Sequence, residues 1–132
     1  MALVLTYGTF DLFHYGHIRL LQRARALGSR LGVGLSTDEF NALKNKKALM
    51  PYEERESLLM TCRFVDFVFP ERNWEQKADD IVAYKAGVLV MGDDWKGKFD
   101  QFSNLCRVVY LDRTPLISST MLREGLRGYD PR

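Results

Sequence analysis

Two histidines flank a glycine near the start of the chain, and they are its only histidines. His14 and His17 are three residues apart, so a helix beginning near Gly16 would place both on nearly the same face. Imidazole rings can donate hydrogen bonds to phosphate oxygens, and the glycine leaves space for a bulky anion. Segment 9–17 is therefore predicted to bind the phosphates of a nucleotide.

Two other interpretations of the histidine pair are weaker. A lone histidine would usually be a satisfied surface or core residue, but here both histidines flank a glycine between a predicted strand and a predicted helix. Zinc could be held by the pair together with Asp11. The spacing does not match the His-Glu-x-x-His helix, however, and neither cysteine is adjacent in sequence.

A cluster of cations follows in a polar segment. It consists of Lys44, Lys46 and Lys47, with Arg55 on the next predicted helix. Such a run is usually solvated surface, and this remains the better prediction for Lys47. If the chain joins two anionic substrates, cations are needed to bring them together, and these side chains are then candidate binding residues.

Segment 92–95, Gly-Asp-Asp-Trp, directly follows a predicted buried strand. Glycine and aspartate are common in turns, so a plain turn is one interpretation. The other, given equal weight, is that Asp94 helps to hold Mg²⁺ or orients the nucleotide.

Segment 113–120 combines a cation, several hydroxyls and a predicted helix N-terminus. That combination suits triphosphate oxygens, and it is compatible with a serine capping the last helix. The candidate nucleotide-binding residues in it are Arg113, Thr114, Ile117, Ser118, Ser119 and Thr120.

A sheet would bring these segments together. Apolar runs predict strands at 2–7, 31–36, 65–69, 88–91 and 108–111, with Gly32 and Gly34 marking close packing. Helices are predicted from position 17 to a cap at Gly28, from Pro51, over 74–85 and over 118–126. This alternation predicts a Rossmann-like, doubly wound α/β fold of about five parallel strands with helices on both faces. Ligands of such sheets bind at the carboxyl ends of the strands.

Length and composition restrict the class of protein. With 132 residues, 46% hydrophobic and 27% charged, the chain fits one globular domain spanning 1–132. A net charge of +2 is far from the basic excess of a protein that tracks nucleic acid. Cys62 and Cys106 are expected to be buried thiols of a reducing cytoplasm, and the apolar N-terminal run is too short for a membrane span or signal. No nucleic-acid or membrane partner is expected.

Together these motifs resemble the cytidylyltransferases, a family of the nucleotidyltransferase superfamily with an H-x-G-H loop and a late R-T-x-x-I-S-[ST]-T segment. The matching segments cover nearly the whole chain and are 6–11, 14–17, 36–41, 73–77, 90–95 and 113–114. The loop alone indicates only the superfamily. Segments 73–77 (Asn-Trp-Glu-Gln-Lys) and 92–95 are most similar to the branch that uses glycerol 3-phosphate.

The resemblance implies an enzyme that transfers CMP from CTP to glycerol 3-phosphate, giving CDP-glycerol for teichoic-acid-like or other surface polymers. It also implies Mg²⁺, a cytoplasmic location and a homodimer. The implied catalytic residues are His14, His17, Lys44 and Arg113. Nucleotide contacts would come from segment 113–120 and from Thr9, Phe10, His14, Tyr15, Gly16, His17, Lys46 and Asp94. Acceptor contacts would come from Asp11, Lys44, Arg55 and Lys77.

One segment departs from the family pattern. Pro115 and Leu116 stand where the family has Glu-Gly, which removes backbone freedom beside the nucleotide. This leaves open another phosphorylated alcohol or sugar as acceptor, or ATP in place of CTP. A non-catalytic nucleotide-binding module is less favoured, because a binder has no need of acceptor-side lysines.

Overall fold

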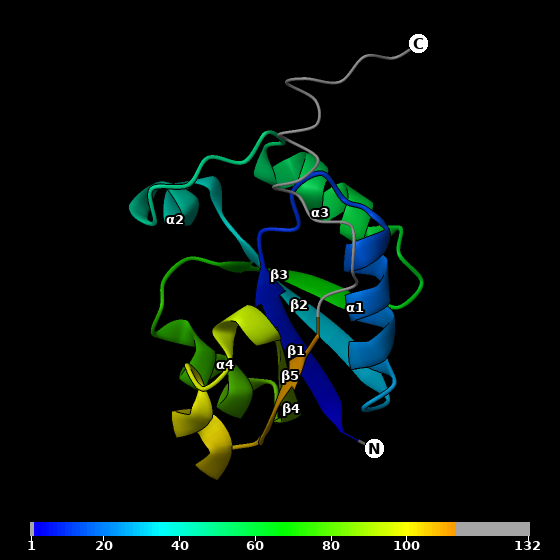
Figure 1. Ribbon diagram of the computed structural model, residues 1–132, viewed down its shortest axis with the longest axis vertical. Coiled ribbons are helices and arrows are strands. Elements are labelled where there is room, and N and C mark those ends of the chain that lie inside the picture. The colour runs from blue at the N-terminus through cyan, green and yellow to red at the C-terminus, as the bar shows by residue number, and fades with distance from the viewer. Residues whose placement is uncertain (1, 113–132) are drawn as a thin grey trace.

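The computed structural model describes residues 2–112 and contains one sheet of five parallel strands (Figure 1). The strands are β1 (Leu3–Gly8), β2 (Arg30–Ser36), β3 (Phe67–Glu71), β4 (Ala86–Gly92) and β5 (Arg107–Leu111). Their order is β3-β2-β1-β4-β5, so β2 and β3 lie on one side of β1, and β4 and β5 lie on the other. The expected doubly wound parallel sheet is confirmed, and its switch point lies beside β1.

Helices cover both faces of the sheet. They are α1 (Tyr15–Arg25), α2 (Asp38–Leu43), α3 (Tyr52–Met60) and α4 (Gln76–Ala83), with short 3-10 turns η1 (Asp93–Trp95) and η2 (Asp100–Asn104). Figure 1 shows α1 and α3 on one side of the sheet and α4 on the other. Alternate residues of the central strands supply the two cores, with Val4 facing α1 and α3, and Leu5 facing α4.

Several element boundaries differ from the sequence prediction. The third strand begins two residues later than predicted, at Phe67, and as an edge strand it can include Pro70. Helix α1 ends at an Ala26 cap rather than at Gly28; a Cβ at Gly28 would lie 2.2 Å from the Ala2 carbonyl oxygen, so close packing explains that glycine. Helix α2 was not predicted. The predicted helix over 118–126 lies outside the described residues.

Close packing also explains the two glycines of β2. A Cβ at Gly32 would lie 2.4 Å from the Phe67 ring, and one at Gly34 would lie 2.3 Å from the Tyr7 ring. The interpretation of these glycines as sites of close approach is therefore confirmed. Gly34 leaves the space in which the Tyr7 ring lies.

The cysteines were expected to be buried, and the N-terminal apolar run was expected to be too short to span a membrane. Cys62 and Cys106 are free thiols, and both are only partly buried. Between residues 2 and 112, no helix has the length and apolar character needed to cross a membrane.

Candidate active site

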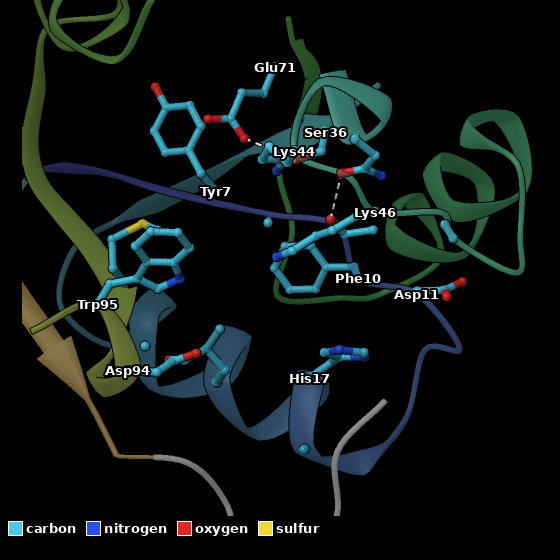
Figure 2. Close-up of a pocket in the computed structure, with 18 of the residues that line it drawn as sticks. Tyr7, Phe10, Asp11, His17, Ser36, Lys44, Lys46, Glu71, Asp94 and Trp95 are labelled. Carbon is cyan, nitrogen blue, oxygen red and sulfur yellow. Dashed lines mark hydrogen bonds between the residues drawn. The ribbon is translucent and has the colours of Figure 1, made fainter. Parts of the chain in front are cut away.

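A pocket of about 550 Å³ lies at the carboxyl ends of the strands (Figure 2). It brings together most of the site residues predicted from the sequence: Thr9, Phe10, Asp11, His14, Gly16, His17, Lys44, Lys46, Lys77 and Asp94. Lys47, predicted to be solvated surface, is exposed and also lines it. Tyr15 points to solvent, with 59% of its surface exposed, and is not among the lining residues. Segment 113–120 lies outside the described residues.

The two histidines form the start of α1. His14 is the N-cap, and its Nδ1 accepts a hydrogen bond of 2.9 Å from the Gly16 N–H. The His14 N–H in turn donates to Nδ1 of His17 at 3.2 Å, and the two rings stack with their centroids 3.9 Å apart. Because both Nδ1 atoms accept, each neutral ring must carry its hydrogen on Nε2. The Nε2 of His14 is buried and has no hydrogen-bond partner.

Burial keeps both rings neutral. Desolvation lowers the pKa of His14, and desolvation together with the neighbouring His14 lowers the pKa of His17 from 6.5 to about 3. Neutral imidazoles with the hydrogen on Nε2 are hydrogen-bond donors, so both rings can donate to an anion although neither is positively charged. The free N–H groups and positive dipole end of α1 add to that capacity.

A strained turn places an aromatic ring against the histidines. Phe10 and Leu12 have φ angles of 51° and 50°, in the left-handed region that non-glycine residues rarely adopt. Phe10 is buried, and its ring centroid lies 5.3 Å from that of His17. The turn therefore fixes the histidine rings from the side of β1.

Asp11 anchors the segment that carries the lysines. Its buried carboxylate accepts hydrogen bonds from the backbone N–H groups of Leu49 (2.9 Å) and Met50 (3.1 Å). Asp11 thus lines the pocket, but its carboxylate binds the backbone of the lysine segment, whereas the resemblance implied a contact with the acceptor.

Arg55 lies behind the pocket rather than in it. Its guanidinium is fully buried and donates to the carbonyl oxygens of Thr9 and Ser36, each at 2.9 Å, while another donor pairs with Asp38 at 2.7 Å. This differs from the acceptor contact expected from the sequence, because the donors of Arg55 are used within the protein. Arg55 joins the ends of β1 and β2 to α2.

The end of the pocket opposite the histidines holds a buried ion pair. Lys77 donates to one oxygen of Glu71, and the other oxygen of Glu71 accepts from the Ser36 hydroxyl at 3.1 Å. The Lys44 ammonium donates to the same hydroxyl at 3.3 Å. Burial lowers the pKa of Lys44, an effect that Glu71 opposes. Figure 2 shows Glu71, Lys44 and Ser36 at one end of the pocket, and His17 and Asp94 at the other.

Ser36, Asn41 and Glu71 are polar pocket residues that were not predicted as site residues. Glu71 closes β3, but the predicted strand ended at 69; a charged residue after Pro70 at a strand end was the missed signal. Asn41 lies in α2, the unpredicted helix. It is buried, accepts from the Thr9 hydroxyl at 3.1 Å, and its Nδ2 has no partner.

Asp94 lies in η1, directly after β4, and lines the pocket. A Cβ at Gly92 would lie 2.8 Å from its Oδ1, so the glycine permits the tight turn that brings this carboxylate to the pocket. Within residues 2–112, no group of three or more His, Cys, Asp or Glu side chains could hold a metal ion. Mg²⁺ is commonly held by one or two carboxylates together with substrate phosphates, so Asp94 fits the role of a single protein ligand.

Comparisons of sequence and of fold each find related proteins. The family model described as cytidylyltransferase-like matches residues 5–125. The glycerol-3-phosphate cytidylyltransferase of Bacillus subtilis (strain 168) is 56% identical over 128 residues, covering 97% of this chain and 99% of the relative. The enzyme of that name from Staphylococcus aureus (strain NCTC 8325 / PS 47) is 51% identical, with both chains fully covered. The lipopolysaccharide core biosynthesis protein from Thermoplasma volcanium GSS1 shares the fold, with a TM-score of 0.76 at 21% identity over 86% of this chain and 98% of that one.

Proposed function

Because this chain belongs to the cytidylyltransferase-like family, we propose that it transfers CMP from CTP to glycerol 3-phosphate, releasing pyrophosphate and forming CDP-glycerol. The names and the near-complete coverage of the bacterial relatives support the choice of both substrates. The observation that carries the reaction class is the buried, unpartnered Nε2 of His14, stacked with His17 at the start of α1. A buried donor of this kind is costly unless a ligand accepts from it.

The proposed chemistry is a single in-line displacement. A phosphate oxygen of the acceptor forms a bond to the α-phosphorus of CTP, and the bond from that phosphorus to pyrophosphate breaks. The Nε2–H groups of His14 and His17 would donate to the oxygens around the α-phosphate as negative charge develops there. No covalent intermediate with the protein is required, so catalysis rests on positioning and charge stabilisation.

The cations of the pocket divide between the two substrates in this proposal. Lys46 is exposed at the rim and would contact the CTP phosphates, as would Arg113 and the hydroxyls of segment 113–120. Lys44 would hold the phosphate of the acceptor, since within residues 2–112 its ammonium donates to the Ser36 hydroxyl and has further N–H donors to offer. Thr9, which follows β1, and Asn41, which lies in α2, offer polar groups to the nucleotide.

Mg²⁺ is proposed as the divalent ion that accompanies CTP. Asp94 would hold it together with triphosphate oxygens, and when bound the ion would neutralise charge on the leaving pyrophosphate. The homodimer and the cytoplasmic location expected from the resemblance stay predictions, and sedimentation of the purified chain tests the first.

Pyrophosphate release with a panel of substrates tests the proposal. CTP with glycerol 3-phosphate is expected to be the best combination, while ATP or other phosphorylated alcohols and sugars should react far more slowly. His14→Ala and His17→Ala should each lower kcat by about 10²- to 10³-fold, because each removes one donor to the developing charge. Thermal unfolding of both variants checks that they remain folded. Turnover of either variant near the parent rate would contradict the mechanism, and CTP binding without pyrophosphate release would favour the non-catalytic module.

A further inference from the structure

The ammonium group of Lys77 lies inside a cage of aromatic rings. It is 4.7 Å from the ring centroid of Tyr7, 5.3 Å from that of Phe99 and 5.6 Å from that of Trp74. The carboxylate of Glu71 closes the cage by pairing with the ammonium. We refer to these four residues, Tyr7, Glu71, Trp74 and Phe99, as the ammonium cage.

The burial of this lysine is unusual. Lysine side chains normally extend along an apolar surface to place the ammonium in water, and a buried ammonium costs free energy even when it is paired. Lys77 is the second residue of α4, and only 2% of its surface is exposed. Aromatic rings combined with a carboxylate are the groups by which proteins bind a ligand that carries an ammonium group. Here the protein's own side chain fills such a site.

The cage belongs to the substrate pocket. All four cage residues and Lys77 line the same cavity as His14 and His17. Lys44 lies beside it, with its ammonium 5.5 Å from the centroid of Trp74, and the Tyr7 hydroxyl donates to Asp80 at 2.8 Å, so this end holds two ammonium groups and two carboxylates. An acceptor whose phosphate lies between Lys44 and the histidines would extend its alcohol portion toward the cage, where the Lys77 ammonium occupies the position of a second cation and repels it.

We propose that Lys77 determines acceptor specificity: its ammonium fills the ammonium cage and excludes phosphorylated amino alcohols, while neutral acceptors such as glycerol 3-phosphate fit beside it. This proposal rests on the proposed function and deepens it. It also changes the role expected for Lys77, from a ligand of the acceptor phosphate to a group that selects the other end of the acceptor.

Two substitutions distinguish the effect of the volume that the Lys77 side chain fills from the effect of its charge. Lys77→Ala empties the cage and leaves the Glu71 carboxylate unpaired, whereas Lys77→Met removes the charge but keeps a side chain of similar length in the cage. With phosphoethanolamine as acceptor the reaction is unchanged: a phosphate oxygen bonds to the α-phosphorus of CTP, and pyrophosphate leaves with the electron pair. Lys77→Ala is expected to raise the ratio of kcat/KM for phosphoethanolamine over glycerol 3-phosphate by about tenfold or more, and Lys77→Met to raise it less.

If the unpaired Glu71 carboxylate prevents the Lys77→Ala variant from folding, the same comparison is made in a Glu71→Gln background, which removes that charge. The double variant Glu71→Gln/Lys77→Ala should still favour phosphoethanolamine more than Glu71→Gln/Lys77→Met does, through the rings alone, but by a smaller factor. A general loss of structure would lower both activities together and would leave the ratio unchanged.

A binding measurement keeps the two proposals distinguishable. Ethylammonium chloride, compared with equal sodium chloride, is expected to raise the Tm of Lys77→Ala but not that of Lys77→Met or the parent. Failure of the parent to use glycerol 3-phosphate would overturn the proposed function alone, because this readout needs no turnover. Equal acceptor ratios and equal ethylammonium responses in the alanine and methionine variants would overturn the ammonium cage.

Discussion

Backbone N–H groups of segment 14–17 orient both histidine rings of the pocket. Nδ1 of His14 accepts from Gly16, and Nδ1 of His17 accepts from the His14 N–H. The spacing of the two residues was enough to predict a phosphate site, since both lie on one face of a helix start. Spacing could not predict which nitrogen faces the ligand, because that depends on His14 being the N-cap rather than the first helical residue.

The lowered pKa of His17 makes stability depend on pH. The unfolded chain takes up a proton near pH 6.5, whereas the folded protein does so only at about 3, so this contribution is complete above pH 6.5 and is lost as the pH falls toward 3. The expected slope is up to about 1.4 kcal/mol per pH unit. Urea unfolding of the parent and of His17→Asn between pH 7 and 5 measures it. The parent should lose stability more steeply, and parallel curves would contradict the prediction.

Arg55 is expected to stabilise the fold mainly through its hydrogen bonds to carbonyl oxygens, and only slightly through its ion pair with Asp38. Arg55→Met would leave carbonyl oxygens of Thr9, Ser36 and Met50 without a donor, and should lower the free energy of unfolding by about 3 kcal/mol or more. Asp38→Asn is the matched control. The Asp38 side chain is 47% exposed, so weakening the ion pair from that side should cost less than about 1 kcal/mol. Similar losses in both variants would show that the ion pair dominates.

The lysine segment between α2 and α3 depends on one carboxylate of another element. Asp11 follows β1, yet it holds the backbone at Leu49 and Met50. Asp11→Ala should therefore raise KM for both substrates severalfold, because the segment carrying Lys44 and Lys46 is no longer held against the pocket. Steady-state kinetics checks this. Asp66→Ala, which removes an equivalent contact to the Leu31 N–H outside the pocket lining, should lower stability without changing KM.

Central strands were easier to predict than the edge of the sheet. β1, β2 and β4 are buried runs of apolar residues bounded by turn residues, and their predicted positions are confirmed. β3 pairs only with β2 and includes Pro70, so its alternation is weak and its last residue was missed. That residue is Glu71, so the carboxylate that pairs with Lys77 was not predicted, although Lys77 itself was. α2 has six residues, too few for a helical period to be recognised.

At the level of the whole molecule, the site exists only because strands distant in sequence end together. His17 follows β1, Ser36 ends β2, Glu71 ends β3 and Asp94 follows β4. The sequence predicted this convergence because parallel strands must share an edge at which their carboxyl ends lie. It could not predict the contacts between these ends, such as that of Glu71 with Ser36, because they depend on the register of β2 against β3.

Ligand binding across this edge should stabilise the entire fold. At a CTP concentration of 100 times Kd, the free energy of unfolding is expected to rise by about 2.7 kcal/mol, because only the folded chain has the pocket. Thermal unfolding followed by circular dichroism measures the effect. ATP at the same concentration should stabilise less, and equal stabilisation would favour the adenylyltransferase alternative.

The two tryptophans of the pocket have an optical consequence. Trp74 and Trp95 are the only tryptophans of the chain, their ring centroids are 6.2 Å apart, and both line the pocket. Indole emission therefore originates from one end of the pocket and from nowhere else in the protein. Filling that end with an acceptor should change the wavelength and intensity of this emission, whereas a ligand confined to the histidine end should affect it less. Titration of the parent with glycerol 3-phosphate, followed by indole emission, would therefore test without a label whether the acceptor binds beside Trp74 and Trp95.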